Sequence, residues 1–102
     1  MKFGLPLAVI EQIQAVFTNY PVIDRVIIYG SRVKGTYKTG SDIDLSMFGN
    51  TISSEIHTEI QSDLEDLPIP YMIDLSIFEQ IHNEKLKEHI MRVGQVFYER
   101  DQ

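Results

Sequence analysis

The sequence contains no cysteine. The chain therefore forms no disulfide bond and no thiolate-bound zinc site. Its histidines, His57, His82 and His89, do not have the spacing of metal ligands,. We expect His57 and His89 to lie on helix surfaces.

Positive charge is scarce. Lysine and arginine number 9 against 15 aspartates and glutamates, which leaves a net charge of −6. A protein whose main task is to bind nucleic-acid backbone needs a basic surface, so this balance argues against direct nucleic-acid binding. A local basic patch remains around Arg32, Lys34 and Lys38.

Long hydrophobic runs are also missing. The apolar stretch near the start is interrupted by Glu11, which makes it too short for a secretory signal or a membrane span. We expect a cytoplasmic protein without membrane contact. The length of 102 residues and the hydrophobic content of 43% indicate one domain over residues 1–102 with a single modest core.

Helical and strand patterns alternate along the chain. Apolar residues at helical spacing predict three helices. The first covers residues 6–19, the second runs from a cap at Thr51 or Ser53 to about Leu67, and the third covers residues 83–93,. Short runs bounded by turn residues predict strands over 23–30, 42–48, 70–78 and 95–98,. This order indicates an α/β (α+β) domain with a small mixed sheet flanked by helices.

The end of the first predicted strand has the features of a phosphate site. A glycine at Gly30 allows the backbone to approach a ligand, and Ser31 adds a hydroxyl where a short helix, about 32–35, would begin,. The start of a helix presents unpaired N–H groups and a positive dipole end, both of which favour phosphate. The spacing from Gly30 to Gly35 matches a P-loop, but Thr36 stands where that motif requires lysine,.

Two aspartates open the next predicted strand. Because residues two apart in a strand point to the same face, Asp42 and Asp44 would share one face,. Like charges held close together repel, and a divalent cation would compensate them. The alternative is that both are solvated charges at the end of a strand.

A third aspartate, Asp74, interrupts an otherwise apolar strand. It would share a face with Met72 and Ser76,. Asp74 either converges on Asp42 and Asp44 as a third acidic group or faces solvent on an edge strand.

The elements Gly30-Ser31 and Ser41-Asp42-Ile43-Asp44-Leu45 together resemble the signature of the DNA polymerase β-like nucleotidyltransferases. The short length is similar to that of the minimal nucleotidyltransferases (MNT). The resemblance implies a nucleotidyltransferase-type core whose substrate is ATP. It also implies that Asp42 and Asp44 hold Mg²⁺, and that Asp74 binds a second ion or accepts the proton of the attacking hydroxyl.

The same resemblance implies a phosphate-binding set made of Gly30, Ser31, Arg32 and Ser41. Because this core would use nearly the whole chain, we expect a partner to supply the acceptor. MNT proteins accompany helical HEPN proteins as antitoxins in two-gene modules, and can transfer AMP to a tyrosine of the toxin. Two alternatives stay open. The first is a nucleotide-binding subunit that only masks a helical partner, and the second is an enzyme that transfers a nucleotide to a small molecule.

Overall fold

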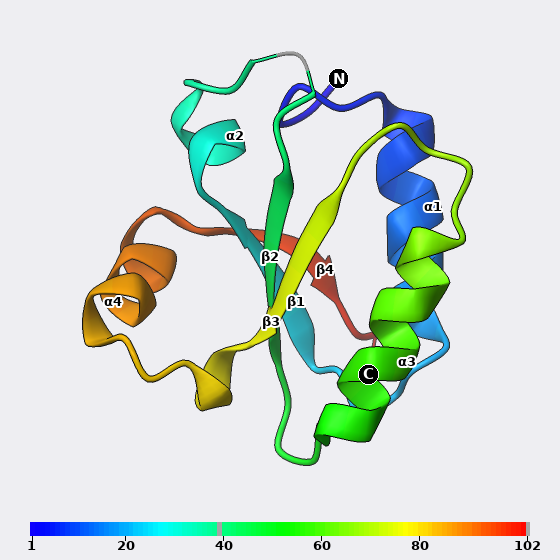
Figure 1. The fold of residues 1–102 in the computed structure, drawn as a ribbon, viewed down its shortest axis with the longest axis vertical. Helices are drawn as coiled ribbons and strands as arrows, with labels where there is room; N and C mark the ends of the chain where they lie inside the picture. Colours follow the sequence, from blue (N-terminus) through cyan, green and yellow to red (C-terminus); the bar gives the residue numbers. More distant parts are fainter. Residues whose placement is uncertain (39, 102) are drawn as a thin grey trace.

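A four-stranded mixed sheet forms the centre of the protein. The computed structural model describes residues 1–38 and 40–101. The strands are β1 (Arg25–Tyr29), β2 (Ile43–Phe48), β3 (Ile73–Ile77) and β4 (Gln95–Glu99), in the spatial order β3-β2-β1-β4 (Figure 1). β1 is antiparallel to both of its neighbours, whereas β2 and β3 run parallel. The expected α+β fold with a small mixed sheet is therefore confirmed.

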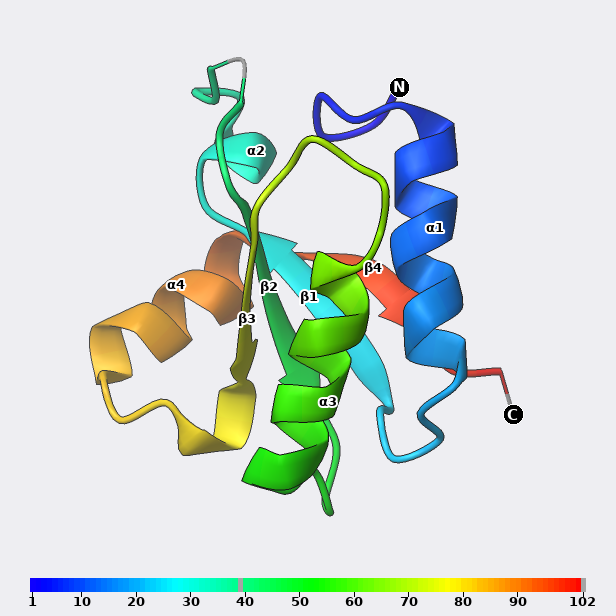
Figure 2. The same cartoon turned by 45° about the vertical axis from the view of Figure 1, so that its right-hand side comes forward.

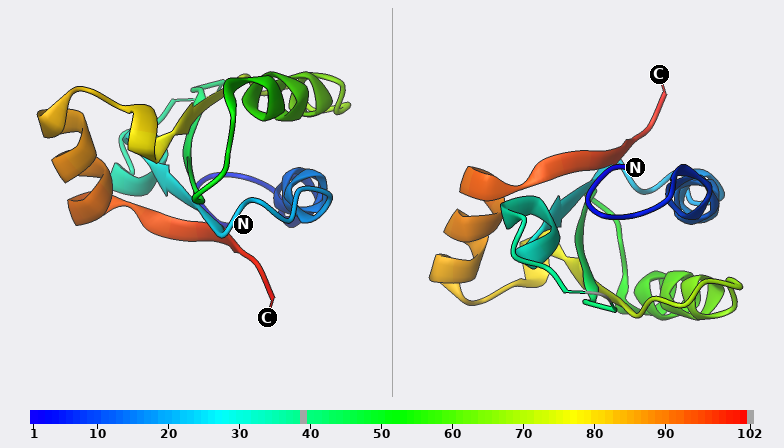
Figure 3. Two further views of the ribbon diagram at one scale, coloured as in Figure 1. Left: turned by 90° about the horizontal axis from the view of Figure 1, so that it is seen from below. Right: turned by 90° about the horizontal axis from the view of Figure 1, so that it is seen from above.

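Helices cover both faces of this sheet. The helices α1 (Leu7–Thr18) and α3 (Ser54–Glu65) lie side by side on one face, and α4 (Glu84–Val93) lies on the other (Figure 3). The short helix α2 (Ser31–Lys34) follows β1, and a 3₁₀ turn, η1 (Phe78–Gln80), follows β3. Within residues 1–38 and 40–101, no helix is long and apolar enough to cross a membrane.

The capping residues identified in the sequence begin these helices as expected. The hydroxyl of Ser53 accepts the N–H of Ile56, and the side chain of Asn83 accepts the N–H groups of Lys85 and Leu86. Each bond satisfies a donor that has no acceptor inside its helix. The predicted boundaries of α3 and α4 therefore follow from local capping chemistry.

The main core lies between the sheet and the pair α1 and α3. Each element contributes one face, because strand side chains alternate and helix side chains recur every three or four residues. The helices bury Val9, Ile10, Ile13, Val16, Phe17, Ile60 and Leu64. The strands bury Val26, Ile28, Ile43, Leu45, Met47, Leu75 and Ile77 against them. The opposite face of each strand is left for α4 and for the acidic residues.

A smaller cluster joins α4 to the other face of the sheet. It centres on Ile27, Tyr29 and Ile90. Gly94 ends α4 as predicted, but its φ of −65° is not the left-handed conformation that usually selects glycine at this position,. A Cβ atom at Gly94 would lie 2.4 Å from Ile27 Cγ2, so close packing requires glycine here.

Candidate active site

Three polar side chains form a row across the face of the sheet that carries α4. In the strand register, Asp74 of β3 lies opposite Asp44 of β2, and Asp44 lies opposite Tyr29 of β1. Neighbouring strands are about 4.8 Å apart. Asp44 is therefore flanked at close range by a second carboxylate and by a tyrosine ring.

The environment of Asp44 opposes its ionisation. Burial raises the pKa of the Asp44 carboxyl, and the charges of Asp74 and then of Asp42 raise it further,. Asp44 is partly buried, whereas Asp42 and Asp74 are exposed. The contribution of Asp42 indicates that this residue, immediately before β2, also lies near Asp44. The structure therefore brings the three predicted acidic residues to one end of the sheet.

The structure agrees in part with each of the two interpretations of Asp74. β3 is an edge strand and Asp74 is exposed, as the alternative interpretation expected. Asp74 nevertheless lies directly opposite Asp44, as the functional interpretation expected. Across residues 1–38 and 40–101, no group of three His, Cys, Asp or Glu side chains is already arranged to hold a metal ion. The role of the three aspartates as metal ligands stays a prediction.

Gly30 connects the predicted phosphate element to these carboxylates. Its φ of 82° lies in the region that favours glycine, and a Cβ atom there would lie 2.4 Å from Asp44 Oδ2,. The carboxylate of Asp44 therefore occupies the space that a side chain at Gly30 would need. Helix α2 begins at the next residue, Ser31, which is partly exposed. The first N–H groups of α2 have no acceptor within the helix. They follow directly after Gly30, whose backbone lies against Asp44.

Arg32 lies differently from what a phosphate contact would require. Its side chain is only 4% exposed. Nε and Nη2 donate to the carbonyl oxygen of Ser41 at 3.2 and 2.8 Å, and Nη1 donates to that of Phe3 at 3.0 Å. The guanidinium is therefore engaged by backbone carbonyl groups, while Lys34 and Lys38 of the same basic patch are exposed.

Ser41 closes the turn that precedes Asp42. Its hydroxyl accepts the backbone N–H of Lys38 at 2.7 Å, and its own N–H donates to the Lys38 carbonyl at 2.9 Å. A hydroxyl that accepts one hydrogen bond retains a hydrogen that it can donate. The predicted phosphate contact of Ser41 is compatible with this geometry and stays a prediction.

Sequence reasoning did not identify Tyr29 as part of the site. Its ring is 8% exposed and meets the edge of the His89 ring at a centroid distance of 6.2 Å. Burial raises the pKa of the Tyr29 hydroxyl, and the nearby charges of Asp44 and Asp74 also favour its neutral form,. Only its place next to Gly30 at the end of an apolar strand could have drawn attention to it.

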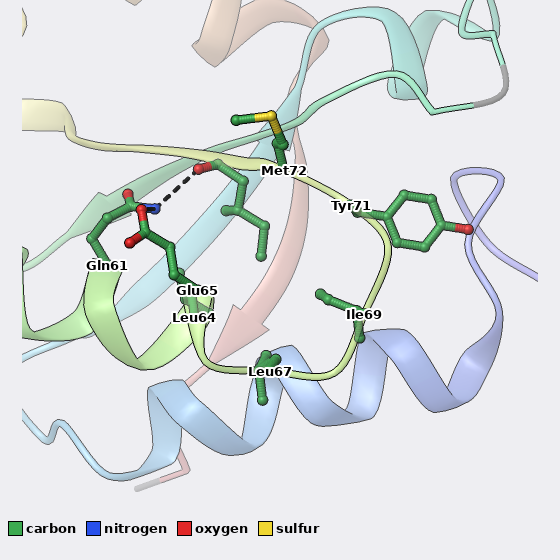
Figure 4. A pocket seen from close by; sticks show the side chains of 8 residues that line it. Gln61, Leu64, Glu65, Leu67, Ile69, Tyr71 and Met72 are labelled. Atoms are coloured by element: carbon green, nitrogen blue, oxygen red, sulfur yellow. Dashed lines mark hydrogen bonds between the residues drawn. The ribbon is translucent and has the colours of Figure 1, made fainter.

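Two side chains of α3 hold the outer edge of β3. His57 Nε2 donates to the Leu75 carbonyl at 2.7 Å. Gln61 Nε2 donates to the Ile73 carbonyl at 3.1 Å, as the dashed line in Figure 4 shows. These two bonds lie on either side of Asp74. His57 was expected on a helix surface, but it is partly buried and serves as a hydrogen-bond donor to the edge strand.

A cavity of about 200 Å³ lies beside the segment that leads into β3; Figure 4 shows the side chains that line it. Its apolar lining comes from Leu64, Leu67, Ile69, Tyr71, Met72 and Ile73. None of the three aspartates lines it. The cavity is therefore separate from the acidic row.

Comparison with known proteins places this geometry in context. A family model described as "Polymerase beta, Nucleotidyltransferase" matches residues 11–102. Comparison with curated proteins found no match.

Three solved structures have a similar fold. A toxin–antitoxin crystallised with AMP-PNP has a TM-score of 0.73 at 19% identity, over 91% of this chain and 75% of that one. A nucleotidyltransferase-like protein from Sulfolobus solfataricus has a TM-score of 0.60 at 21% identity, over 92% and 80%. A mutant of the toxin–antitoxin MntA–HpeT has a TM-score of 0.68 at 16% identity, over 96% and 76%. At these identities the likeness concerns the fold.

Proposed function

Because the chain belongs to the polymerase β nucleotidyltransferase family, we propose that it transfers AMP from ATP to a partner protein in a Mg²⁺-dependent reaction. The observation that carries this proposal is the contact between the two halves of the site. The backbone of Gly30, where the phosphate element begins, lies against the carboxylate of Asp44, and Asp44 lies opposite Asp74.

The acidic residues fit a magnesium site in their chemistry. Carboxylate oxygens are the donors that Mg²⁺ prefers. Burial raises the pKa of Asp44, repulsion from Asp74 and Asp42 raises it further, and a cation would relieve this repulsion,. Asp42 and Asp44 would hold one ion, and Asp74 would hold a second. Bound Mg²⁺ would neutralise charge on the triphosphate and favour departure of pyrophosphate.

The remaining residues would bind and orient the reactants. Gly30, Ser31 and the first N–H groups of α2 would bind the β- and γ-phosphates, and Ser41 would add a hydroxyl contact. Asp74 is exposed at the edge of the sheet, where an acceptor hydroxyl can reach it. If it does not hold a metal ion, Asp74 would accept the proton of that hydroxyl.

We propose that the acceptor is a tyrosine of a helical HEPN-type toxin in the cytoplasm, for which this chain is the antitoxin. Support comes from two structures of similar fold that are described as toxin–antitoxin complexes, one of them with AMP-PNP.

The test is to incubate the purified chain with labelled ATP and Mg²⁺, with and without the protein encoded by the neighbouring gene. We expect a stable complex on size exclusion and an added AMP on a tyrosine of the partner by mass spectrometry. Asp44→Asn should still form the complex but transfer no label. A neighbour that neither binds nor becomes labelled would contradict the antitoxin proposal.

A second function, masking of the partner without catalysis, is favoured by one observation. In the described part of the chain, the acidic side chains do not stand ready as a three-ligand metal group. Under this alternative the complex forms, the toxin is inhibited, and Asp44→Asn inhibits as well as the parent. Catalytic inhibition instead requires ATP and is lost in the variant.

A further inference from the structure

Arg32 is a buried cation. In the described residues, none of the ion pairs joins it to a carboxylate. Removing a charge from water is unfavourable unless hydrogen bonds compensate it. Here the compensation comes from backbone carbonyl groups of two segments. Ser41 lies immediately before Asp42, while Phe3 and Gly4 form a turn ahead of α1 and accept from Nη1 at 3.0 and 3.4 Å.

A third segment contacts the same guanidinium through an aromatic face. Arg32 Cζ lies 5.1 Å from the centre of the Tyr71 ring and 5.1 Å from that of Tyr37,. Tyr71 is three residues ahead of Asp74. Figure 2 shows the N-terminal turn, the loop after α2 and the segment before β3 gathered at one end of the sheet. Arg32 therefore links the N-terminal turn to two segments, at Ser41 and Tyr71, that lead directly into the acidic row.

The N-terminal turn has an unusual conformation where it meets Arg32. Phe3 has a φ of 58°, which is uncommon for a residue with a side chain, and Gly4 has a φ of 70°,. A Cβ atom at Gly4 would lie 2.3 Å from the Tyr37 ring. This turn directs two carbonyl groups at one guanidinium. A lysine could not reproduce the planar set of donors that serves them.

We propose that Arg32 is a positioning residue of this site, which places Asp42 and the segment leading to Asp74 by joining them to the Phe3–Gly4 turn. The proposal rests on the proposed function in one respect only: it takes Asp42 to be a ligand of Mg²⁺ during nucleotide transfer. It assigns the turn at residues 3–4 a part in positioning the site, although no hydrogen bond among the described residues joins that turn to an aspartate. Positioning and direct phosphate contact predict different kinetics.

The experiment compares the parent with Arg32→Lys, with Gly4→Ala and with the control Arg100→Lys, each in complex with its acceptor. Arg100 also binds a backbone carbonyl, that of Pro21, and pairs with Asp24 at 3.1 Å, but it lies on the far end of the sheet. If Arg32 positions Asp42, Arg32→Lys lowers kcat by about 100-fold, because small misplacements are costly in rate. The Mg²⁺ concentration for half-maximal activity rises, and KM for ATP changes little.

Gly4→Ala should act in the same direction, because its new methyl group would displace Tyr37 from Arg32 without altering the arginine. Hydrogen exchange of the free protein gives a readout that needs neither metal nor activity. Amides of residues 40–44 should exchange about tenfold faster in both variants, while those of α3 stay as in the parent. Arg100→Lys should change none of these quantities.

Two outcomes would overturn the proposal. The first is a rise of about tenfold or more in KM for ATP in Arg32→Lys with an unchanged Mg²⁺ requirement, as expected for a lost charged contact with phosphate. The second is parent-like exchange at residues 40–44 in Gly4→Ala. If the parent itself transfers no nucleotide, the proposed function fails, whereas the exchange measurements still decide the role of Arg32.

Discussion

Asp44→Asn tests whether the acidic row is a binding site or a structural feature. The substitution nearly preserves the shape of the side chain and removes its charge. In the folded protein, Asp44 lies between Asp74 and Tyr29 and against the backbone of Gly30. Burial raises the pKa of Asp44 and repulsion from Asp74 and Asp42 raises it further; a neutral amide at this position would relieve the repulsion.

The expected gain in stability follows from the geometry. Two unit charges about 5 Å apart, the spacing of neighbouring strands, repel by about 1 kcal/mol in water and by about 3 kcal/mol at an effective dielectric constant of 20. The lower figure applies because Asp74 is exposed. A gain of about 1 kcal/mol corresponds to an increase in Tm of about 4–8 °C for a chain of this size.

The gain should depend on pH in a defined direction. The pKa of Asp44 is raised above its ordinary value of 3.8 in the folded state. The parent therefore loses stability as the pH rises from that ordinary value through the raised one, because folding then opposes ionisation. Asp44→Asn does not undergo this loss. Its advantage in the metal-free state should be full at neutral pH and should shrink in acid.

Thermal melts with and without ATP–Mg²⁺ provide the assay. A ligand that binds only the folded state at 100 times its Kd stabilises by about 2.7 kcal/mol, and the variant should lose this response. Glu11→Gln on α1 is the matched control, since it removes the same charge from an exposed position on the other face of the sheet. A variant that melts several degrees lower without metal, yet is still stabilised by ATP–Mg²⁺, would refute the proposed site.

Three further changes test neighbouring features. Ser31→Ala should weaken ATP–Mg²⁺ binding by about 1–3 kcal/mol in calorimetry without changing the free energy of unfolding; parent-like binding would remove Ser31 from the phosphate site. Gly30→Ala should reduce both binding and stability, because its Cβ would overlap the Asp44 carboxylate and its φ is 82°. Tyr20 donates a hydrogen bond to Asp63, and this bond raises the pKa of the Tyr20 hydroxyl to about 12. The bond therefore stabilises the fold below pH 10, and that stability is lost between pH 10 and 12. Tyr20→Phe should cost about 1 kcal/mol at neutral pH in urea unfolding, with a difference that vanishes over this range; a constant difference would contradict it.

The helices and strands were largely predictable because their signals are local. Periods of two and of about four residues depend only on backbone geometry, and the caps at Ser53 and Asn83 act within one helical turn,. The shared face of Asp42 and Asp44 and the glycine at Gly30 were readable for the same reason. The turn η1 was not predicted, since no periodic pattern marks so short an element.

Long-range placement required the tertiary structure. The sequence indicated that Asp74 faces away from Leu75, but only strand order and register place it opposite Asp44 at an exposed edge. Register is determined by which apolar faces pack together across the whole sheet, and no local pattern reports it. The same holds for Tyr29, which joins the site only through its pairing with Asp44.

Arg32 shows the difference most clearly. The sequence shows that a cation follows Gly30-Ser31, and the family resemblance implied that this cation contacts phosphate. The direction of its side chain depends on carbonyl groups of Phe3 and Ser41, which only folding brings within reach. A buried guanidinium donates hydrogen bonds to the acceptors that surround it, because an unsatisfied buried charge is unfavourable. Those acceptors belong to the tertiary structure.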